Sequence, residues 1–227
     1  MKKRLKNSTE PELISKPRSS ASEQYRSVRA NLGFLIKDKN YKSILITSAE
    51  AGAGKTTTGV NLALTFATQG TKILYIDADL RKPMVHKHLG LSNLKGLTSH
   101  LVNDIPLDEC IQTKEEFLGL DVLTAGPVPP NPAECLNSKA MDNLLSNVEG
   151  IYDLILIDTP PALVVGDAKV LASKKEIDGI LLVARHNQTK KAELSQTKQN
   201  LKQVDANFIG IVLNDTPKTK HTYYYGA

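Results

Sequence analysis

The chain has 227 residues, a net charge of +5 and two cysteines. That length suits one α/β domain with one large core. No apolar run approaches the roughly 20 residues that a membrane-spanning helix needs, and the basic start Met1-Lys2-Lys3-Arg4 is not followed by the apolar region of a signal peptide. These features predict a cytoplasmic protein whose cysteines stay reduced.

Residues 1–21 are expected to form a flexible basic tail. Its positive charges are Lys2, Lys3, Arg4, Lys6, Lys16 and Arg18. Such a tail can contact anionic lipid, nucleic acid or an acidic partner, but a solvated arm explains it equally well. No aromatic residues alternate with the basic ones, so stacking on single-stranded nucleic acid has no support and no specific nucleic-acid partner is expected.

A helix is predicted from Ser22 to about Ile36. It would dock on the domain through an apolar stripe formed by Tyr25, Val28, Leu32 and Leu35. Three charged residues, Glu23, Arg26 and Arg29, recur at every third position and so share one side of the helix. By their spacing alone, these charges form an ordinary solvated face.

Residues 43–68 have the order of a phosphate-binding site: an apolar strand, a loop of small residues and a helix from Thr56 to Thr68. Gly52 and Gly54 let the backbone approach phosphate oxygens, and the helix N-terminus points free N–H groups at the anion. Lys55 is placed to reach the outer phosphates, and Thr56 to offer its hydroxyl to Mg²⁺. The expected cradle consists of Gly52, Ala53, Gly54, Lys55, Thr56 and Thr57. Ala49 stands where the usual pattern has a glycine, and a plain glycine turn is the alternative.

Two further apolar strands end in aspartates. Residues 72–77 lead to Asp77 and Asp79, and residues 152–158 lead to Asp158. In parallel α/β sheets ligands gather at the carboxyl ends of strands, so the three carboxylates should converge near the phosphates held by Lys55. Bound Mg²⁺ would remove the repulsion between them. Taken singly, each aspartate is better explained as a helix cap or a turn former.

The remaining apolar runs complete the expected fold. Strands are predicted at residues 120–124, 179–184 and 208–213. Apolar strands that alternate with helical stretches predict a single α/β domain over residues 22–214, with a mostly parallel, doubly wound sheet flanked by helices. The proline-rich loop at 126–132 is expected to pack as a stiff connector.

The last segment, residues 215–227, is expected to be a flexible tail. It carries three consecutive phenols, Tyr223, Tyr224 and Tyr225. Clustered acceptor hydroxyls in a chain that can hold a nucleoside triphosphate predict that the protein phosphorylates its own kind on tyrosine. A sticky, disordered end is the alternative.

Together these motifs resemble the bacterial tyrosine kinases (BY-kinases) of the polysaccharide co-polymerase type, cytoplasmic partners in capsule and exopolysaccharide export. The resemblance covers nearly the whole chain. It is carried by the phosphate loop at 54–57, the Asp-x-Asp-x-Arg segment at 77–81, the Ile-Asp-Thr-Pro-Pro segment at 157–161, the proline loop at 126–132 and the terminal tyrosines. Cell-division and plasmid-partitioning ATPases are also similar, but they carry a lysine where this chain has Glu50. The chain departs from these kinases at 51–54, where Ala-Gly-Ala-Gly replaces the Pro-Gly-Glu-Gly that they often have.

The resemblance implies a protein-tyrosine kinase that uses ATP and Mg²⁺. Lys55 would hold the β- and γ-phosphates and offset charge in the transition state. Thr56 would ligate Mg²⁺ directly. Asp79 and Asp158 would hold the metal directly or through water.

Three further residues are assigned roles in this mechanism, that of Asn214 by its likeness to the equivalent residue of related ATPases. Asp77 would accept or orient the tyrosine proton, because a phenol with a pKa of about 10 needs help to lose it. Asn214, at the end of the last predicted strand, would contact the adenine, although a strand-ending turn explains it as well. Arg81 is expected to brace its loop and not to act in the chemistry.

The resemblance also implies assembly. In similar kinases a Glu-x-x-Arg-x-x-Arg helix packs against a neighbouring subunit near its nucleotide site, and Glu23, Arg26 and Arg29 match that pattern. The tail of one copy would then enter the site of another within a homo-oligomer such as a ring. A separate membrane-spanning activator would recruit the kinase to the inner face of the cell membrane, where other protein tyrosines are further substrates.

Two other functions stay open from the sequence. An ATPase switch of the partitioning type would use water as the acceptor and would not need the tyrosines. A nucleotide-sensing scaffold for an export complex would have no kinase activity, and the altered phosphate loop with Ala49 keeps that alternative open.

Overall fold

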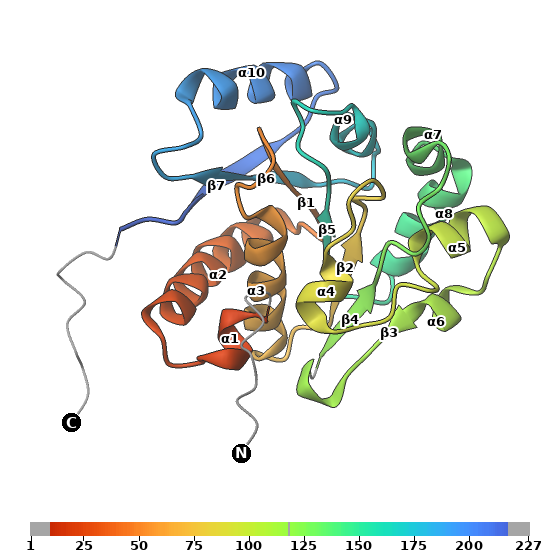
Figure 1. Cartoon of the computed structure of the whole chain (residues 1–227), viewed down its shortest axis with the longest axis horizontal. Coiled ribbons are helices and arrows are strands. Elements are labelled where there is room, and N and C mark those ends of the chain that lie inside the picture. The colour runs from red at the N-terminus through yellow and green to blue at the C-terminus, as the bar shows by residue number, and fades with distance from the viewer. Residues whose placement is uncertain (1–9, 118, 218–227) are drawn as a thin grey trace.

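The computed structural model describes residues 10–117 and 119–217. Within them lies a seven-stranded sheet with the order β3-β4-β2-β5-β1-β6-β7 (Figure 1). The β3–β4 pair is antiparallel and the other neighbours are parallel. The strands are β1 (Ser43–Ser48), β2 (Ile73–Asp77), β3 (Ile111–Gln112), β4 (Leu120–Leu123), β5 (Leu154–Asp158), β6 (Gly179–Arg185) and β7 (Phe208–Asn214).

Helices cover both faces of the sheet (Figure 1). One apolar core contains residues of α1 (Glu12–Ser15), α2 (Ser20–Lys39), α3 (Lys55–Ala67) and α4 (Val85–Leu89). The other contains residues of α5 (Leu97–Asn103), α6 (Leu107–Cys110), α7 (Pro132–Leu136), α8 (Lys139–Glu149), α9 (Asp167–Ala172) and α10 (Lys191–Lys202). A short 3₁₀ helix spans Glu115–Phe117. The predicted α/β fold with a mostly parallel, doubly wound sheet is therefore confirmed.

The register of the central strands brings two aspartates to the same level of the sheet. β2 and β5 pair in parallel with Asp77 opposite Asp158, and β1 pairs with β5 so that Ile46 also lies opposite Asp158. All residues of β1, β2 and β5 are buried because helices cover both faces. The loops that follow these three strands must therefore meet at one edge of the sheet.

The N-terminal region is more regular than the sequence suggests. Residues 12–15 form α1, and α2 begins at Ser20 and not at Ser22. The side chain of Ser19 caps α2 by accepting a hydrogen bond from the backbone of Ser22 at 3.1 Å. The expectation of an irregular tail up to Ala21 is thus wrong for these residues, while residues 1–9 lie outside the described part of the chain.

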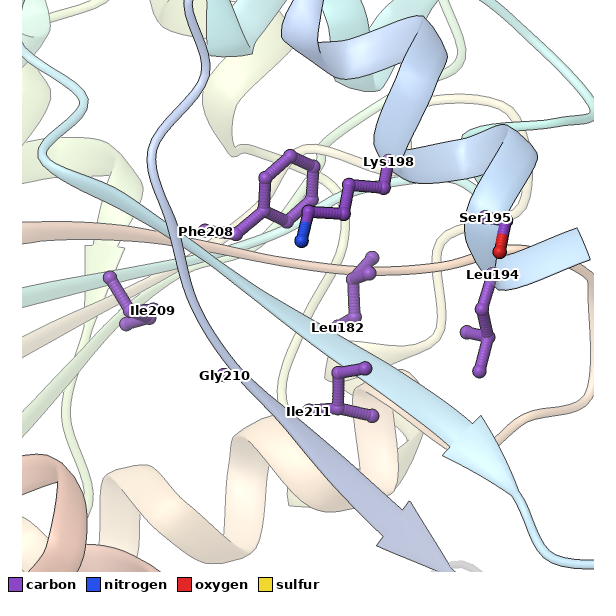
Figure 2. A pocket seen from close by; sticks show the side chains of 8 residues that line it. All are labelled: Leu182, Leu194, Ser195, Lys198, Phe208, Ile209, Gly210 and Ile211. Carbon is purple, nitrogen blue, oxygen red and sulfur yellow. The ribbon is translucent and has the colours of Figure 1, made fainter. Parts of the chain in front are cut away.

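Strand β7 is the less covered edge of the sheet. Ile211 and Leu213 remain more than half exposed, at 57% and 52%. Figure 2 shows the pocket that α10 leaves open beside β7, with Leu194 of α10 facing Leu182 and Ile211. The last strand therefore contributes less apolar burial than the strands that carry the aspartates.

None of the helices in the described ranges combines the length and the apolar character that crossing a membrane requires.

A glycine where α5 begins supplies a test of the packing. A Cβ atom on Gly96 would lie 2.2 Å from the carbonyl oxygen of Thr124 and 2.5 Å from the amide nitrogen of Gly126. Since both are backbone atoms, Gly96→Ala should lower the free energy of unfolding by about 1–3 kcal/mol in urea denaturation. Gly150→Ala is the control, because its nearest neighbour would be 3.8 Å away. Equal unfolding midpoints for the two variants would contradict this account of α5.

Candidate active site

The loop between β1 and α3 has the backbone shape of a phosphate cradle. Gly52 and Gly54 both occupy the left-handed region, with φ of 81° and 87°. A Cβ atom on Gly54 would also lie 2.1 Å from the Asn214 amide nitrogen, which donates a hydrogen bond to the carbonyl of Ala53 at 3.1 Å. No side chain caps the N-terminus of α3, so its first N–H groups are available to an anion.

Ala49, which departs from the usual pattern, fits this loop without strain. Its side chain is fully buried, and its φ is not among the positive values of the described residues. Its carbonyl accepts a hydrogen bond from Leu163 at 3.2 Å, which ties the phosphate loop to the segment after β5. A glycine is therefore not required at this position.

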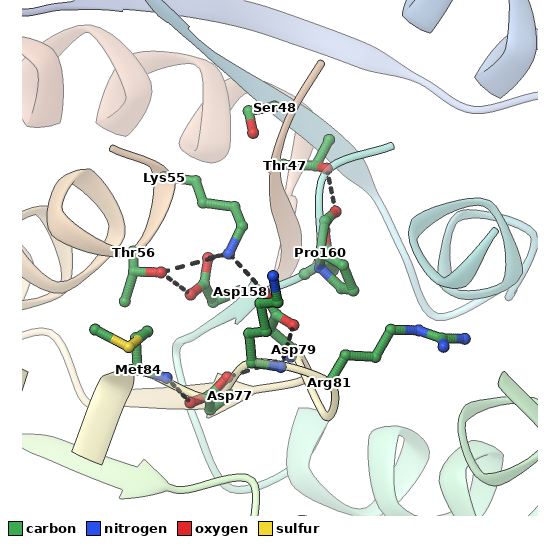
Figure 3. Close-up of polar contacts among 12 residues, drawn as sticks. Thr47, Ser48, Lys55, Thr56, Asp77, Asp79, Arg81, Met84, Asp158 and Pro160 are labelled. Atoms are coloured by element: carbon green, nitrogen blue, oxygen red, sulfur yellow. Dashed lines mark hydrogen bonds and ion pairs between the residues drawn. The ribbon is translucent and has the colours of Figure 1, made fainter. Parts of the chain in front are cut away.

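Three strand ends place a charged cluster beside the cradle (Figure 3). The Lys55 ammonium lies 3.0 Å from Asp79 Oδ2 and 3.7 Å from Asp158 Oδ1. The hydroxyl of Thr56 donates a hydrogen bond to Asp158 Oδ2 at 2.5 Å. The predicted convergence of strand-end aspartates on Lys55 and Thr56 is thus present.

Burial and charge shift the protonation of this cluster. Burial, followed by the Asp158 charge, raises the pKa of Asp77 well above its ordinary value. Burial also raises the pKa of Asp158, although Lys55 and Thr56 oppose the shift. Burial acts to lower the pKa of Lys55, but the carboxylates of Asp158 and Asp79 outweigh it, so that pKa is raised. The lysine therefore stays charged and compensates the buried carboxylates.

Asp77 and Asp79 hold the loop that contains them. Asp77, which is fully buried, accepts hydrogen bonds from the backbone of Asp79 at 3.2 Å, Met84 at 3.2 Å and Val85 at 3.1 Å. Asp79 accepts one from the backbone of Lys82 at 3.0 Å and directs its other oxygen toward Lys55. The same carboxylates that form the site thus determine the path of the backbone around it.

The donor set fits a Mg²⁺ ion that arrives with a nucleotide. In the described ranges no group of three or more His, Cys, Asp or Glu side chains is arranged to hold a metal by itself. Asp158 Oδ1, however, is buried without a hydrogen-bond partner. The other oxygen of this carboxylate, Oδ2, accepts the hydrogen bond from the hydroxyl of Thr56. Mg²⁺ usually takes one or two carboxylates and completes its shell with water and phosphate oxygens, which matches these residues.

The charged residues predicted for assembly lie on α2, where two of them pair with each other. Arg26 forms an ion pair with Glu23 and donates a hydrogen bond to the carbonyl of Pro17 at 2.8 Å. The Nε atom of Arg29 is buried without a hydrogen-bond partner. The predicted phosphorylation sites Tyr223, Tyr224 and Tyr225 lie outside the described residues.

Asp167 is a residue near the site that sequence reasoning misses. Its side chain is 1% exposed and accepts two hydrogen bonds from Arg81, at 2.8 and 3.0 Å. It stands at the start of α9, where an aspartate is usually explained as a helix-terminus residue. Nothing in the sequence links it to a residue 86 positions earlier.

Comparison with known proteins agrees with this geometry. A family model described as an AAA domain matches residues 41–208. The tyrosine-protein kinase YwqD of Bacillus subtilis (strain 168) is 44% identical over 94% of this chain and 90% of that protein.

Two solved structures are similar over the whole domain. The kinase domain of the Escherichia coli tyrosine kinase ETK has a TM-score of 0.86 and 34% identity, covering 99% of this chain and 89% of that one. The chimerical protein CapA2B2 also has a TM-score of 0.86, with 38% identity and coverage of 94% and 92%. By sequence, the chain spans 29% of the length of the full E. coli etk protein, to which it is 37% identical. The phosphate loop, the paired strand-end carboxylates and these relatives together show that the chain belongs to the bacterial tyrosine-protein kinases, within the AAA-domain proteins.

Proposed function

We propose that this kinase uses ATP and Mg²⁺ to phosphorylate Tyr223, Tyr224 and Tyr225 on a neighbouring copy of itself, and thereby regulates capsular or extracellular polysaccharide synthesis. The observation that carries the proposal is the buried group in which Lys55 and Thr56 meet Asp79 and Asp158 beside the glycine loop. Relatives named tyrosine-protein kinases favour this function over an ATPase switch or a scaffold.

Phosphoryl transfer depends mainly on positioning and on stabilising charge. When bound, ATP with Mg²⁺ would supply the transferable phosphoryl group and a positive charge that offsets the charge of the phosphates. The backbone of residues 52–57 would bind and orient the phosphates, and Lys55 would contact their outer oxygens. Thr56 and Asp158, which share a hydrogen bond of 2.5 Å, would hold the metal, and Asp79 would hold it directly or through water.

Asp77 is the proposed acceptor of the tyrosine proton. It lies opposite Asp158 in the sheet register, at the end of β2. Burial raises the pKa of Asp77, and the positive charges of Lys55 and of the bound cation would keep its carboxylate ionised, so that it can accept the proton of a phenol. Its oxygens accept backbone hydrogen bonds from Asp79, Met84 and Val85, so a small opening of this loop would accompany proton transfer.

Asn214 is proposed to contact the adenine. It lines a cavity between the end of β7 and the first half of α2, together with Tyr25 and Val28. Its hydrogen bond to Ala53 keeps this cavity next to the phosphate cradle. A base bound there would contact the face of α2 that carries Tyr25 and Val28.

Assembly through α2 would bring the tail of one copy to the site of another. Glu23 is exposed at the beginning of α2, on the helix that borders the Asn214 cavity. Each added phosphate brings about −1.5 to −2 charges, so phosphorylated tails should oppose assembly. Glu23, Arg26 and Arg29 are therefore proposed to form part of the contact between copies.

The activator is proposed to be a separate membrane-spanning protein. The chain matches most of the length of YwqD but only 29% of full-length E. coli etk, so relatives differ in how much sequence accompanies the kinase domain. A matching chimerical protein supports a partner that can be joined to the kinase. This partner would hold the kinase at the cytoplasmic face of the membrane, near its other protein substrates.

The tail supplies the first test of this function. Replacing Tyr223, Tyr224 and Tyr225 by Phe removes the acceptor hydroxyls but leaves the phosphate loop unchanged. We expect phosphotyrosine, measured by mass spectrometry after incubation with Mg²⁺ and ATP, to fall almost to zero while ATP binding persists. The reaction is run with and without the cytoplasmic segment of the activator. Unchanged phosphotyrosine would show that the acceptors lie elsewhere.

A mixing experiment tests transfer between copies. The Tyr→Phe variant keeps a complete site without acceptors, and Lys55→Met keeps acceptors without a complete site. When the two variants are mixed, phosphotyrosine is expected on the Lys55→Met chains. Neither variant incubated alone should become phosphorylated. If the mixture contains no phosphotyrosine while the parent protein phosphorylates itself, the transfer takes place within one chain.

Asp77→Asn tests the assignment of the proton acceptor. Loss of the carboxylate should lower the phosphorylation rate about 100-fold or more, while the ATP affinity measured by calorimetry changes little. Asp79→Asn is the comparison, because Asp79 contacts Lys55 directly and should affect Mg²⁺-dependent nucleotide binding. A parallel loss of affinity and rate in Asp77→Asn would show that Asp77 acts on nucleotide and metal binding and is not the proton acceptor.

The charges on α2 supply a test of assembly. Glu23→Ala combined with Arg26→Ala should give a smaller particle than the parent protein in light scattering, and adding Arg29→Ala should extend the effect. The control changes the exposed residues Lys37, Asp38 and Lys39 to Ala at the other end of α2. If the particle masses of both sets equal that of the parent, the charges are an ordinary solvated face.

A further inference from the structure

Arg81 points away from the charged cluster, although it belongs to the segment that carries Asp77 and Asp79 (Figure 3). Its Nε donates a hydrogen bond to Asp167 Oδ2 at 2.8 Å, and its Nη2 donates one to Oδ1 at 3.0 Å. This two-point geometry is the strongest that an arginine forms with a carboxylate. Arg81 is thus bound to a neighbouring element and does not face the reacting groups.

On one side of this pair is the loop from Asp77 to Met84. It is closed by the backbone hydrogen bonds that Asp77 and Asp79 accept, so its residues are held in one arrangement relative to one another. Asp79, two residues before Arg81, is the carboxylate of this loop that reaches Lys55 at 3.0 Å. A shift of Arg81 would therefore shift Asp79.

On the other side is the segment from Asp158 to Asp167. It is attached to β1 through Ala162, whose N–H donates to the carbonyl of Ser48 at 2.8 Å, and through Thr47, whose hydroxyl donates to the carbonyl of Pro160 at 2.9 Å. Asp167 ends this segment and is 1% exposed, whereas Arg81 is 40% exposed. The arginine therefore joins the loop of Asp79 to the segment that begins at Asp158.

We propose that the Arg81–Asp167 pair is a positioning element for the kinase reaction: it fixes the separation of Asp79 and Asp158 and so sets the affinity of the site for its divalent cation. This inference rests on the proposed function. Groups that hold metal-binding carboxylates in place from behind are worth about 10- to 100-fold in metal affinity. Arg81 thus acts through Asp79 and does not touch the substrate.

The test measures binding of a fluorescent ATP analogue as the Mg²⁺ concentration is varied, and again in EDTA. Arg81→Met keeps the apolar part of the side chain but removes the guanidinium group that makes both hydrogen bonds. It should raise the half-saturating Mg²⁺ concentration about 10-fold or more. Arg81→Lys keeps the positive charge without the two-point geometry of the guanidinium group. It should raise the half-saturating Mg²⁺ concentration by a smaller factor. Affinity in EDTA should stay that of the parent in both variants.

Asp167→Asn provides a second route to the same result. If the two residues act as a pair, the variant with both Arg81→Met and Asp167→Asn should need no more Mg²⁺ than the worse single variant. Additive shifts, or folded Arg81 variants with the parent's Mg²⁺ dependence, would overturn the inference.

A matched ion pair controls for general loss of stability. Lys174 and Asp142 also pair a buried side chain with a half-exposed one, at 6% and 44% exposure, beyond the other end of α9. Asp142→Asn, which like Arg81→Met removes the half-exposed partner of a buried charge, should lower the unfolding midpoint without changing the Mg²⁺ dependence. An equal Mg²⁺ shift in Asp142→Asn would also overturn the inference. Absence of Mg²⁺-dependent nucleotide binding in the parent would instead overturn the proposed function itself.

Discussion

The buried ammonium group of Lys55 is the interaction on which the rest of the site depends. Carboxylates that leave water and approach one another are costly unless a positive charge compensates them. Lys55 supplies that charge to Asp79 and Asp158, and Thr56 adds a hydrogen bond to the second of them. The lysine thereby allows three strand ends to meet, and a bound metal and nucleotide would take over its contacts during function.

Hydrogen bonds to the backbone turn this charge cluster into a defined geometry. Asp77 accepts three amide hydrogen bonds, and Asn214 fixes the phosphate loop from the far strand β7. Arg81 adds the link between the two segments that carry the carboxylates. Phosphoryl transfer needs groups held in place more than it needs reactive side chains, so an arrangement of this kind suits a kinase.

The same fold serves ATPases whose acceptor is water, so the fold by itself does not select the reaction. What distinguishes a tyrosine kinase is the presence of a phenol that can reach the site. In the function proposed for this chain, that phenol belongs to the C-terminal segment of a neighbouring copy.

The sequence by itself determined the strands that end in Asp77 and Asp158 and the glycine loop before Lys55, because local apolar runs and turn residues specify them. It also predicted the meeting of these groups, since parallel strands share one carboxyl edge. Only the tertiary structure decided the ion pair between Arg81 and Asp167, the antiparallel pairing of β3 and the backbone N–H hydrogen bonds that Asp77 accepts. These features depend on how loops distant in sequence pack together, and no local pattern of residues encodes such contacts.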